Sequence, residues 1–246
     1  MKTLVETIGR LKCRLVGDLL DGEKPHLVVV LSHGYGASGT DLVPIGQELL
    51  DQFPDLRSHV LFVFPEAPLS LDDQGIPGGR AWWPIDLMRL QVAAATGQFR
   101  QLQRDRSDAM VESRNRLIET LQVLSERWGL RLSQFVIGGF SQGAMLSVDT
   151  SLALPENVAG VVAMSGSLLN EAEWLERAPQ HAGLRVLQSH GTADPLLPFD
   201  AAERLRDLLT AAGAVVDFIP FQGGHQIPFE VFDGVGEFLS SLVAAQ

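Results

Sequence analysis

Three short segments of the sequence contain residue types that can carry out nucleophilic catalysis. The first, Gly-Phe-Ser-Gln-Gly at 139–143, has the pattern G-x-S-x-G, in which a serine stands on a tight turn between a strand and a helix. Strand and helix approach each other closely at such a turn, so the flanking residues must be small, and Gly139 and Gly143 meet this need. We interpret Ser141 as a nucleophile. The alternative is a serine that caps a helix in a glycine-rich turn.

An acid and a base follow this serine along the chain. Asp194 stands in Ser-His-Gly-Thr-Ala-Asp-Pro at 189–195, where its carboxylate can accept a hydrogen bond from an imidazole. His225 ends Gly-Gly-His at 223–225, a loop with the freedom to bring the ring to Ser141. Nucleophile, acid and base in this order are typical of α/β-hydrolases. We expect His225 to take and return the serine proton, while Asp194 orients the ring.

Structural roles are the alternatives to these assignments. Asp194 would then only begin a turn before a proline. Asp200 is a rival acid, although it also fits the first turn of a helix over 199–212. Among the other histidines, we expect His190 to hold its own loop through hydrogen bonds and His33 to order the loop in which it stands.

The segment His33-Gly34-Tyr35-Gly36 follows a predicted strand and is a candidate for half of an oxyanion site. Hydrolases of this type stabilise an oxyanion with the backbone N–H of the residue after the nucleophile and a second N–H from an earlier loop. We expect Gln142 to supply the first donor and Tyr35 the second, with Gly36 as the alternative to Tyr35. Backbone groups donate here, so the phenol of Tyr35 is not required.

The composition excludes several other chemistries. All three lysines lie at or before position 24, so the chain has no phosphate-binding Gly-Lys-Ser/Thr motif, and a buried lysine for pyridoxal chemistry is not expected. The only cysteine, Cys13, forms neither an internal disulfide nor a cysteine-rich zinc site. The chemistry must therefore rest on serine, histidine, carboxylates and backbone groups.

Charge and hydropathy limit the partners. The 19 Lys+Arg and 30 Asp+Glu residues among 246 give a net charge of −11, which disfavours nucleic acid as a ligand. No apolar stretch approaches the roughly 20 residues of a membrane span, and the first residues lack the apolar run of a signal peptide. We expect a cytoplasmic protein, monomeric or homodimeric, without stable membrane insertion.

The elements that must position these residues alternate between strand and helix. Continuous apolar runs at 26–32 and 59–64 predict strands buried on both faces. The expected strands are 10–17 (an outer strand), 26–32, 59–64, 134–138, 158–164, 185–189 and 215–221, and the expected helices are 41–52, 107–128, 142–153, 171–177, 199–212 and 229–243. This alternation predicts a mostly parallel sheet with helices on both faces and a ligand site at the carboxyl ends of the strands.

Taken together, the motifs resemble the phospholipase/carboxylesterase family, which includes acyl-protein thioesterases and small bacterial carboxylesterases. The resemblance covers roughly residues 26–240 and rests on His33-Gly34-x-Gly36, Pro65-x-Ala67-Pro68, Ala81-Trp82-Trp83, Gly139-Phe140-Ser141-Gln142-Gly143, His190-Gly191-x-x-Asp194 and Gly223-x-His225. It implies one α/β-hydrolase domain over 1–246 without a large lid domain, and neither a metal nor an organic cofactor. It also implies hydrolysis of carboxylic esters or thioesters of small-molecule or lipid-like acids.

The resemblance leaves the substrate open among esters, thioesters and lysophospholipids. Two further alternatives are a catalytically silent ligand-binding protein of the same fold and a serine peptidase. The chain departs from the family in a longer, Arg-rich segment that we expect to form a helical insertion around 85–112. This insertion is either a solvated helix or a partial cap beside the acyl pocket, with Leu87, Met88, Leu90, Val92 and Phe99 as its apolar residues. The expected pocket wall consists of Trp82, Trp83, Leu69, Leu71 and Leu196.

Overall fold

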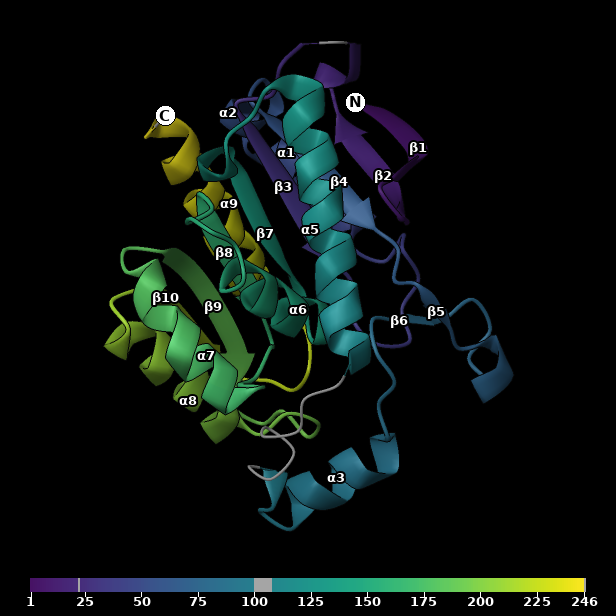
Figure 1. Ribbon diagram of the computed structural model, residues 1–246, viewed down its shortest axis with the longest axis vertical. Helices are drawn as coiled ribbons and strands as arrows, with labels where there is room; N and C mark the ends of the chain where they lie inside the picture. Colours follow the sequence, from purple (N-terminus) through teal and green to yellow (C-terminus); the bar gives the residue numbers. More distant parts are fainter. Residues whose placement is uncertain (22, 100–107, 246) are drawn as a thin grey trace.

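An eight-stranded sheet runs through the centre of the computed structural model (Figure 1), which describes residues 1–21, 23–99 and 108–245. The strands are β1 (Lys2–Ile8), β2 (Leu11–Gly17), β3 (Leu27–Ser32), β4 (Val60–Pro65), β7 (Phe135–Phe140), β8 (Gly160–Met164), β9 (Arg185–Gly191) and β10 (Val215–Phe221). Their order across the sheet is β1-β2-β4-β3-β7-β8-β9-β10. β2 is antiparallel to β1 and β4, and every other neighbouring pair is parallel. The expected α/β class with a mostly parallel sheet is confirmed.

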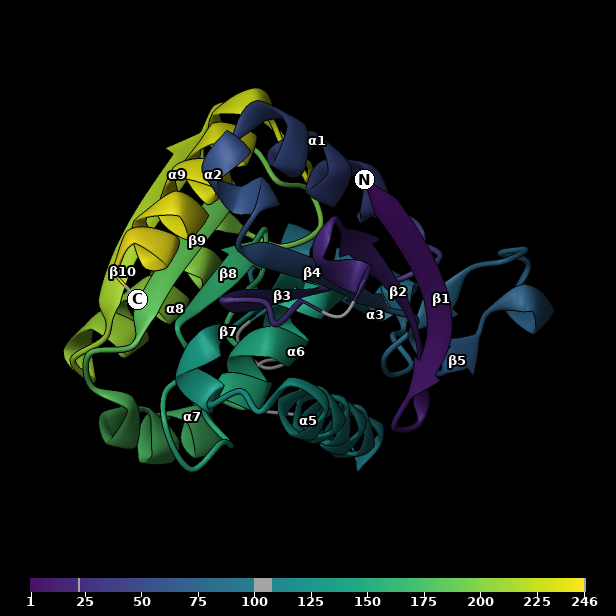
Figure 2. The ribbon, with the colours of Figure 1, turned by 90° about the horizontal axis from the view of Figure 1, so that it is seen from above.

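Helices cover both faces of this sheet, as Figure 2 shows from above. One face carries α1 (Val43–Gln52), α2 (Pro54–Arg57) and α9 (Phe229–Ala244), and the other carries α5 (Asp108–Trp128), α6 (Gln142–Ser151), α7 (Glu171–Arg177) and α8 (Phe199–Ala211). Successive strand residues point to opposite faces. In β3, Val28 and Val30 therefore join the core beneath α5 and α6, whereas Val29 and Leu31 join the core beneath α1 and α9. This two-sided burial explains the continuous apolar runs in the sequence.

The first strand, β1, was absent from the sequence-based expectation. Its residues are mostly exposed, so its sequence lacks the apolar alternation that marks a half-buried strand. The strand expected over 10–17 is present as β2, but its expected place as the outer strand was wrong, because β1 pairs along its free edge and makes β2 the second strand. Cys13 in β2 is fully buried in the core beneath α5, and burial raises the pKa of its thiol to about 12.

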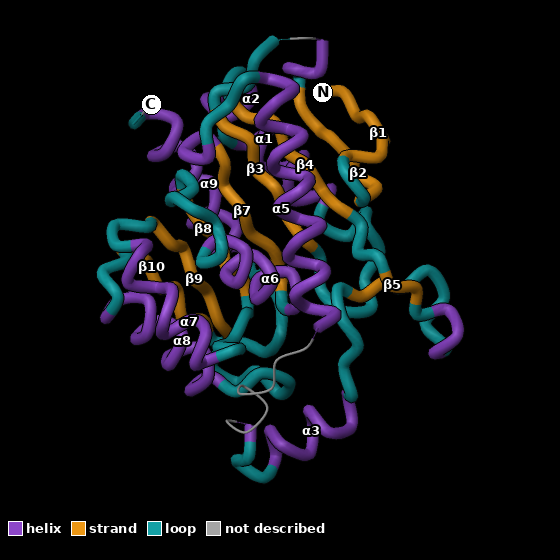
Figure 3. Tube along the Cα trace, viewed as in Figure 1, coloured by secondary structure: helices purple, strands orange, loops and turns teal. Residues whose placement is uncertain are grey.

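Two small features project beyond the carboxyl edge of the sheet (Figure 3). One is the hairpin of β5 (Leu69–Ser70) and β6 (Arg80–Ala81), and the other is the helix α3 (Leu87–Ala95). Short 3-10 turns complete the described structure at Leu19–Asp21, Asp72–Gln74, Leu132–Gln134 and Ala178–His181.

The expected insertion around 85–112 is described in part. Its described residues, 85–99 and 108–112, include α3 and the first turn of α5, whereas Arg100, Arg104 and Arg106 lie outside the described residues. None of the helices in the described ranges is long and apolar enough to cross a membrane.

Candidate active site

Ser141 occupies the single residue between the end of β7 and the start of α6. Its backbone has φ 54° and ψ −115°, a conformation that costs a residue with a Cβ free energy and that clusters at functional sites. The Ser141 N–H donates to the Met164 carbonyl at 2.9 Å, which fixes the turn to β8. A Cβ on Gly139 or Gly143 would lie 2.1 or 1.9 Å from the Ser32 carbonyl oxygen. The two glycines of the motif are therefore required by the approach of β3.

Asp194 and His225 form a tight hydrogen-bonded pair on the loops after β9 and β10. His225 Nδ1 donates to Asp194 Oδ2 at 2.6 Å. The second oxygen, Oδ1, accepts the backbone N–H groups of Leu196 and Leu197 at 2.8 and 3.0 Å. Burial of the carboxylate opposes its ionisation, but these hydrogen bonds outweigh burial and hold the pKa of Asp194 below its ordinary value. The carboxylate is therefore charged and has a fixed orientation.

The loops that carry this pair bind each other backbone to backbone. A Cβ on Gly191 would lie 2.2 Å from the Gly224 carbonyl oxygen, and the Ala193 N–H donates to the Gly223 carbonyl at 2.9 Å. The sequence suggested that the glycines before His225 supply freedom of movement. The structure assigns the space requirement to Gly191, whose lack of a side chain lets the acid loop contact the base loop directly.

Asp200 and His190, the alternatives to Asp194 and His225, make contacts that give them structural roles. Asp200 stands on the surface in the first turn of α8, and its carboxylate bonds Arg204 at 2.6 Å, as the alternative role predicted. His190 is fully buried, and its Nε2 donates to the Leu197 carbonyl at 2.8 Å. Burial lowers the pKa of His190, so its ring stays neutral and holds the loop of Asp194.

His33 orders the loop in which it stands, as expected. Its Nε2 accepts the Ala67 N–H at 3.1 Å and its Nδ1 lies 2.8 Å from the Gly34 carbonyl oxygen. A ring that accepts at Nε2 must carry its proton at Nδ1, so His33 is neutral and donates to Gly34. Burial lowers the pKa of His33 in agreement with this state.

The two candidates for the second oxyanion donor differ in what their N–H groups contact. The Gly36 N–H donates to the Arg80 carbonyl at 2.9 Å and is therefore occupied. The Tyr35 N–H has no hydrogen-bond partner within the described ranges. Gln142 is the first residue of α6, so its N–H has no carbonyl one turn earlier in the helix. The geometry favours Tyr35 with Gln142 over Gly36.

Ser141 and His225 both line one cavity of about 570 Å³. Its wall is mostly apolar, and the side chains come from the loop after β3, from the segment after β6, from α3, α5 and α6, and from the loops after β8 and β9. The Phe140 ring packs beside the His225 ring with centroids 4.7 Å apart. The apolar residues of the wall include Ile76, Trp83, Ile85, Leu87, Leu90, Phe99, Met110, Phe140, Met145, Leu169, Leu196 and Leu197.

Only part of the expected pocket wall lines this cavity. Trp83 and Leu196 do so, whereas Trp82 and Leu71 are buried in the protein interior and Leu69 is exposed on β5. The expectation for Leu69, Leu71 and Trp82 was therefore wrong. The two tryptophans stand on a bend after β6, where Trp83 faces the cavity and Trp82 is fully buried in the core. Of the residues that were missed, Met145 stands four positions after Ser141, and its N–H donates to the Ser141 carbonyl at 3.1 Å, so it lies one helical turn beyond the nucleophile.

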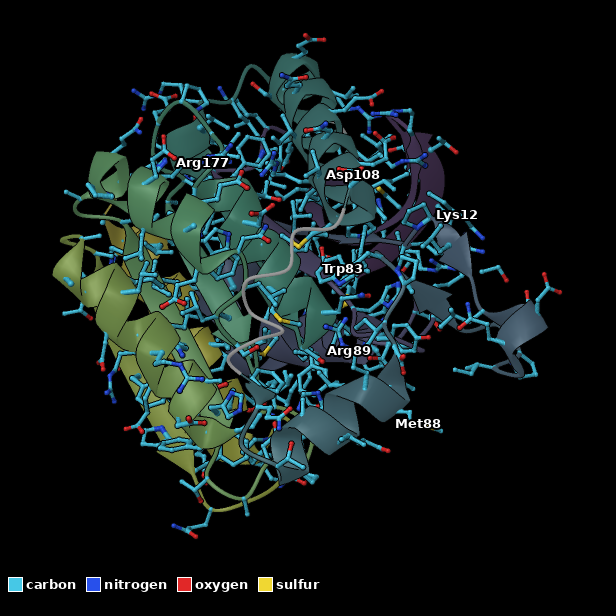
Figure 4. The ribbon with its side chains drawn as sticks, turned by 60° about the horizontal axis from the view of Figure 1, so that its bottom comes forward. Lys12, Trp83, Met88, Arg89, Asp108 and Arg177 are labelled. Atoms are coloured by element: carbon cyan, nitrogen blue, oxygen red, sulfur yellow. The ribbon has the colours of Figure 1, made fainter. Side chains whose placement is uncertain are left out.

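The helix α3 has one face on this cavity and one on the surface. Leu87, Arg89 and Leu90 line the cavity, whereas Met88 and Val92 are 77% and 56% exposed. In Figure 4, Met88 points away from the molecule, while Arg89 of the same helix lies on the side of Trp83. The described part of the insertion is thus both a solvated helix and a partial cover of the cavity. Among the described residues, no group of three or more His, Cys, Asp or Glu side chains is placed to hold a metal ion.

A mostly parallel sheet covered by helices, with a strained serine after β7 and an aspartate–histidine pair after β9 and β10, defines the α/β-hydrolase fold. The family model described as Phospholipase/Carboxylesterase matches residues 20–243. The chain therefore belongs to the phospholipase/carboxylesterase family, and the resemblance drawn from its motifs is confirmed. The expectation of a carboxylesterase-type hydrolase is confirmed with it.

Individual relatives agree with this assignment. An acyl-protein thioesterase 1 of Mycosarcoma maydis is 31% identical over 92% of this chain and 95% of its own length. The crystal structure of esterase PE8 covers 94% of this chain and 99% of its own with a TM-score of 0.77 and 29% identity. A carboxylesterase from Mesorhizobium loti covers 98% of this chain and 99% of its own with a TM-score of 0.73; at 20% identity it supports the fold alone.

Proposed function

We propose that the chain hydrolyses carboxylic esters and thioesters through an acyl-enzyme intermediate on Ser141. The observation that carries the proposal is that Ser141 and His225 line one cavity. On the other side of the ring, His225 Nδ1 is hydrogen-bonded to Asp194 Oδ2 at 2.6 Å. The esterases and acyl-protein thioesterases among its relatives support the same reaction class.

In the first stage, Ser141 Oγ attacks the acyl carbonyl carbon as His225 Nε2 takes the hydroxyl proton. The Asp194 carboxylate stabilises the imidazolium that forms. The N–H groups of Tyr35 and Gln142 receive the negative charge that develops on the carbonyl oxygen. Removing one such donor typically costs about 3 kcal/mol of transition-state stabilisation. When the tetrahedral intermediate collapses, His225 returns the proton to the departing alcohol or thiol.

In the second stage, water replaces the leaving group. His225 takes a proton from the water, whose oxygen attacks the acyl carbon, and the same two N–H groups receive the oxyanion. Breaking the bond to Ser141 Oγ releases the carboxylic acid, and the proton on His225 returns to the serine. In both stages, the proton transfers and the oxyanion stabilisation are assigned to the side chains and backbone donors named here, with water as the second reactant.

The cavity wall supports an apolar acyl group as the substrate. Its apolar side chains remove methylene groups from water, at roughly 0.8 kcal/mol for each buried CH₂. We therefore expect kcat/KM to rise with acyl length from C2 until the cavity is filled. Oxygen esters and thioesters use the same two stages, and measuring both series from C2 to C16 ranks them. Lysophospholipid hydrolysis is the remaining specialisation of this chemistry.

Substituting Ser141 by alanine tests the proposal. The variant is expected to fold and to lose hydrolysis of p-nitrophenyl esters, while a fluorophosphonate labels the wild-type protein at Ser141 and leaves the variant unlabelled. Near-wild-type activity of the folded variant would falsify the proposal. A wild-type protein that neither reacts with the fluorophosphonate nor turns over esters would instead be a ligand-binding protein of the same fold.

A further inference from the structure

The side chain of Gln142 clamps the segment that contains the two tryptophans. Its amide oxygen accepts the Trp82 backbone N–H at 2.8 Å, and its amide nitrogen donates to the Trp83 carbonyl at 2.8 Å. A backbone N–H only donates and a carbonyl only accepts, so these two partners fix which way the amide points. Gln142 and Trp82 are both 0% exposed, so water does not compete for these bonds.

The indole of Trp82 extends this connection to the loop after β3. Its Nε1–H donates to the His33 carbonyl at 2.9 Å, and Ser113 Oγ donates to the carbonyl of Trp82 itself. Three residues after His33, the Gly36 N–H donates to the Arg80 carbonyl at 2.9 Å. The loop is thus fastened to the segment 80–82 on both sides of Tyr35.

The two expected oxyanion donors, Tyr35 and Gln142, lie on separate elements. One follows β3 and the other begins α6, so the distance between their N–H groups depends on what joins the elements. Beside the pairing of β3 with β7, the Trp82 segment gives the two elements a second connection, through its indole on one side and its backbone on the other. Trp82 does not line the cavity, so it does not contact a substrate there.

We infer that Trp82 is a positioning residue for the oxyanion site and acts together with the side chain of Gln142. The inference rests on the proposed function. Backbone donors stabilise a developing oxyanion only when they are aimed at the place where the charge forms. Trp82 and the Gln142 amide keep the N–H groups of Tyr35 and Gln142 at the separation that this requires. Loss of the connection lowers transition-state stabilisation and leaves substrate binding largely intact.

The decisive variant is Trp82→Phe, which keeps an aromatic ring in the core and removes the N–H that bonds His33. We expect kcat to fall by about tenfold or more while KM changes by less than about twofold, because the oxyanion exists only in the transition state. Trp83→Phe is the matched comparison. The Trp83 indole lines the cavity and makes no hydrogen bond to the described residues, so its replacement is expected to alter KM for long acyl chains more than kcat.

A second variant, Gln142→Met, removes the hydrogen bonds between the Gln142 side chain and the backbone of Trp82 and Trp83. Gln142→Met keeps the backbone N–H and approximates the side-chain shape, but it releases Trp82 and Trp83. We expect a similar loss of kcat, and the double variant with Trp82→Phe is expected to lose no more than about the larger single effect, because both act through one segment. A trifluoromethyl ketone inhibitor, which forms a tetrahedral oxyanion on the serine, is expected to bind more weakly in parallel with the loss of kcat/KM.

Thermal unfolding establishes which variants are folded. Wild-type kcat in folded Trp82→Phe or folded Gln142→Met overturns the inference, as does an effect confined to KM. If Trp82→Phe does not fold, kcat and KM are compared instead in Gln142→Met and Ser113→Ala, since both substitutions act on the Trp82 backbone and leave the indole in place. If the wild-type protein itself neither turns over esters nor reacts with a fluorophosphonate, the proposed function fails, which is a different result from a failure of Trp82.

Discussion

His225 donates from Nδ1 to Asp194 at 2.6 Å, and this bond determines the state in which the ring is ready to act. A donor at Nδ1 leaves Nε2 of the neutral ring with its lone pair, which is the form that accepts a proton from a serine. The Asp194 carboxylate is itself held by two backbone N–H groups of its own loop. Neither partner has to rearrange when the imidazolium forms.

Asp194→Asn is expected to lower kcat by about three to four orders of magnitude, because an amide that presents N–H to Nδ1 favours the wrong tautomer. Initial rates on p-nitrophenyl butyrate measure the effect. Asp200→Asn is the control, since Asp200 lies on the surface and bonds Arg204. A loss of equal size in both variants would show that Asp194 acts through stability alone.

Stability is expected to fall as the pH drops from about 7.5 to 5. Burial lowers the pKa of His33 and His190 in the folded protein, whereas the unfolded chain binds a proton with a pKa near 6.5. The unfolded state therefore takes up protons first, and stability that is complete above about pH 6.5 is lost below it. Urea unfolding across this range measures the slope. His190→Gln should reduce the slope, and an unchanged slope contradicts this account.

Exchanging Leu90 and Val92 of α3 for serine tests the two faces of the helix. Leu90 lines the cavity, so Leu90→Ser is expected to lower kcat/KM for C8–C12 esters by about tenfold and to affect acetate esters little. Val92 is 56% exposed, and Val92→Ser should leave hydrolysis of dissolved esters nearly unchanged. Equal effects of the two substitutions on all chain lengths would contradict a role for α3 in holding the acyl group.

Arg114 carries the charge of a buried network between α5, α6 and α7. Its Nη1 bonds Asp149 at 3.2 Å and Glu173 at 3.0 Å, and Asp149 also accepts the Trp174 indole N–H at 2.8 Å. Arg114→Met is expected to cost about 3–5 kcal/mol of unfolding free energy, because it leaves the buried Asp149 carboxylate without its cation, whereas Glu173 keeps Arg177 at 2.7 Å. Burial already raises the pKa of Asp149.

Urea unfolding of Arg114→Met beside Arg10→Met measures this cost. Arg10 bonds Glu112 and Glu119 on the surface, so its replacement is expected to change the midpoint little. Similar midpoints for the two variants would show that the Arg114 network contributes no more than surface pairs do.

The sequence predicted most of the fold because burial leaves a clear pattern. The apolar runs of β3 and β4 and the single apolar face of α5 are direct consequences of packing. β1 was missed because it pairs along an edge and buries almost nothing. Its position depends on a partner strand, and that information is not local.

In the candidate site too, the features encoded in local sequence were predicted and those that depend on distant parts of the chain were not. Ser141, Asp194 and His225 each stand in a short motif whose spacing is local, and the structure brings all three loops to one edge of the sheet. The pocket wall was harder to predict, since Trp82 and Trp83 are identical side chains whose directions depend on the backbone bend between β6 and α3. The contact between Gly191 and the His225 loop likewise depends on how two distant loops meet.

The pairing of Ser32 with Gly139 has a consequence for how the protein acquires its site during folding. These residues lie on parallel strands that are distant in the chain, and such non-local contacts form slowly because a long loop must close first. The carbonyl of Ser32 also bounds the space beneath the turn at Ser141. We therefore expect the nucleophile to reach its strained conformation only after β3 and β7 have paired. In a refolding experiment, recovery of fluorophosphonate labelling should follow the recovery of helical circular dichroism, so that reactivity reports the last stage of assembly.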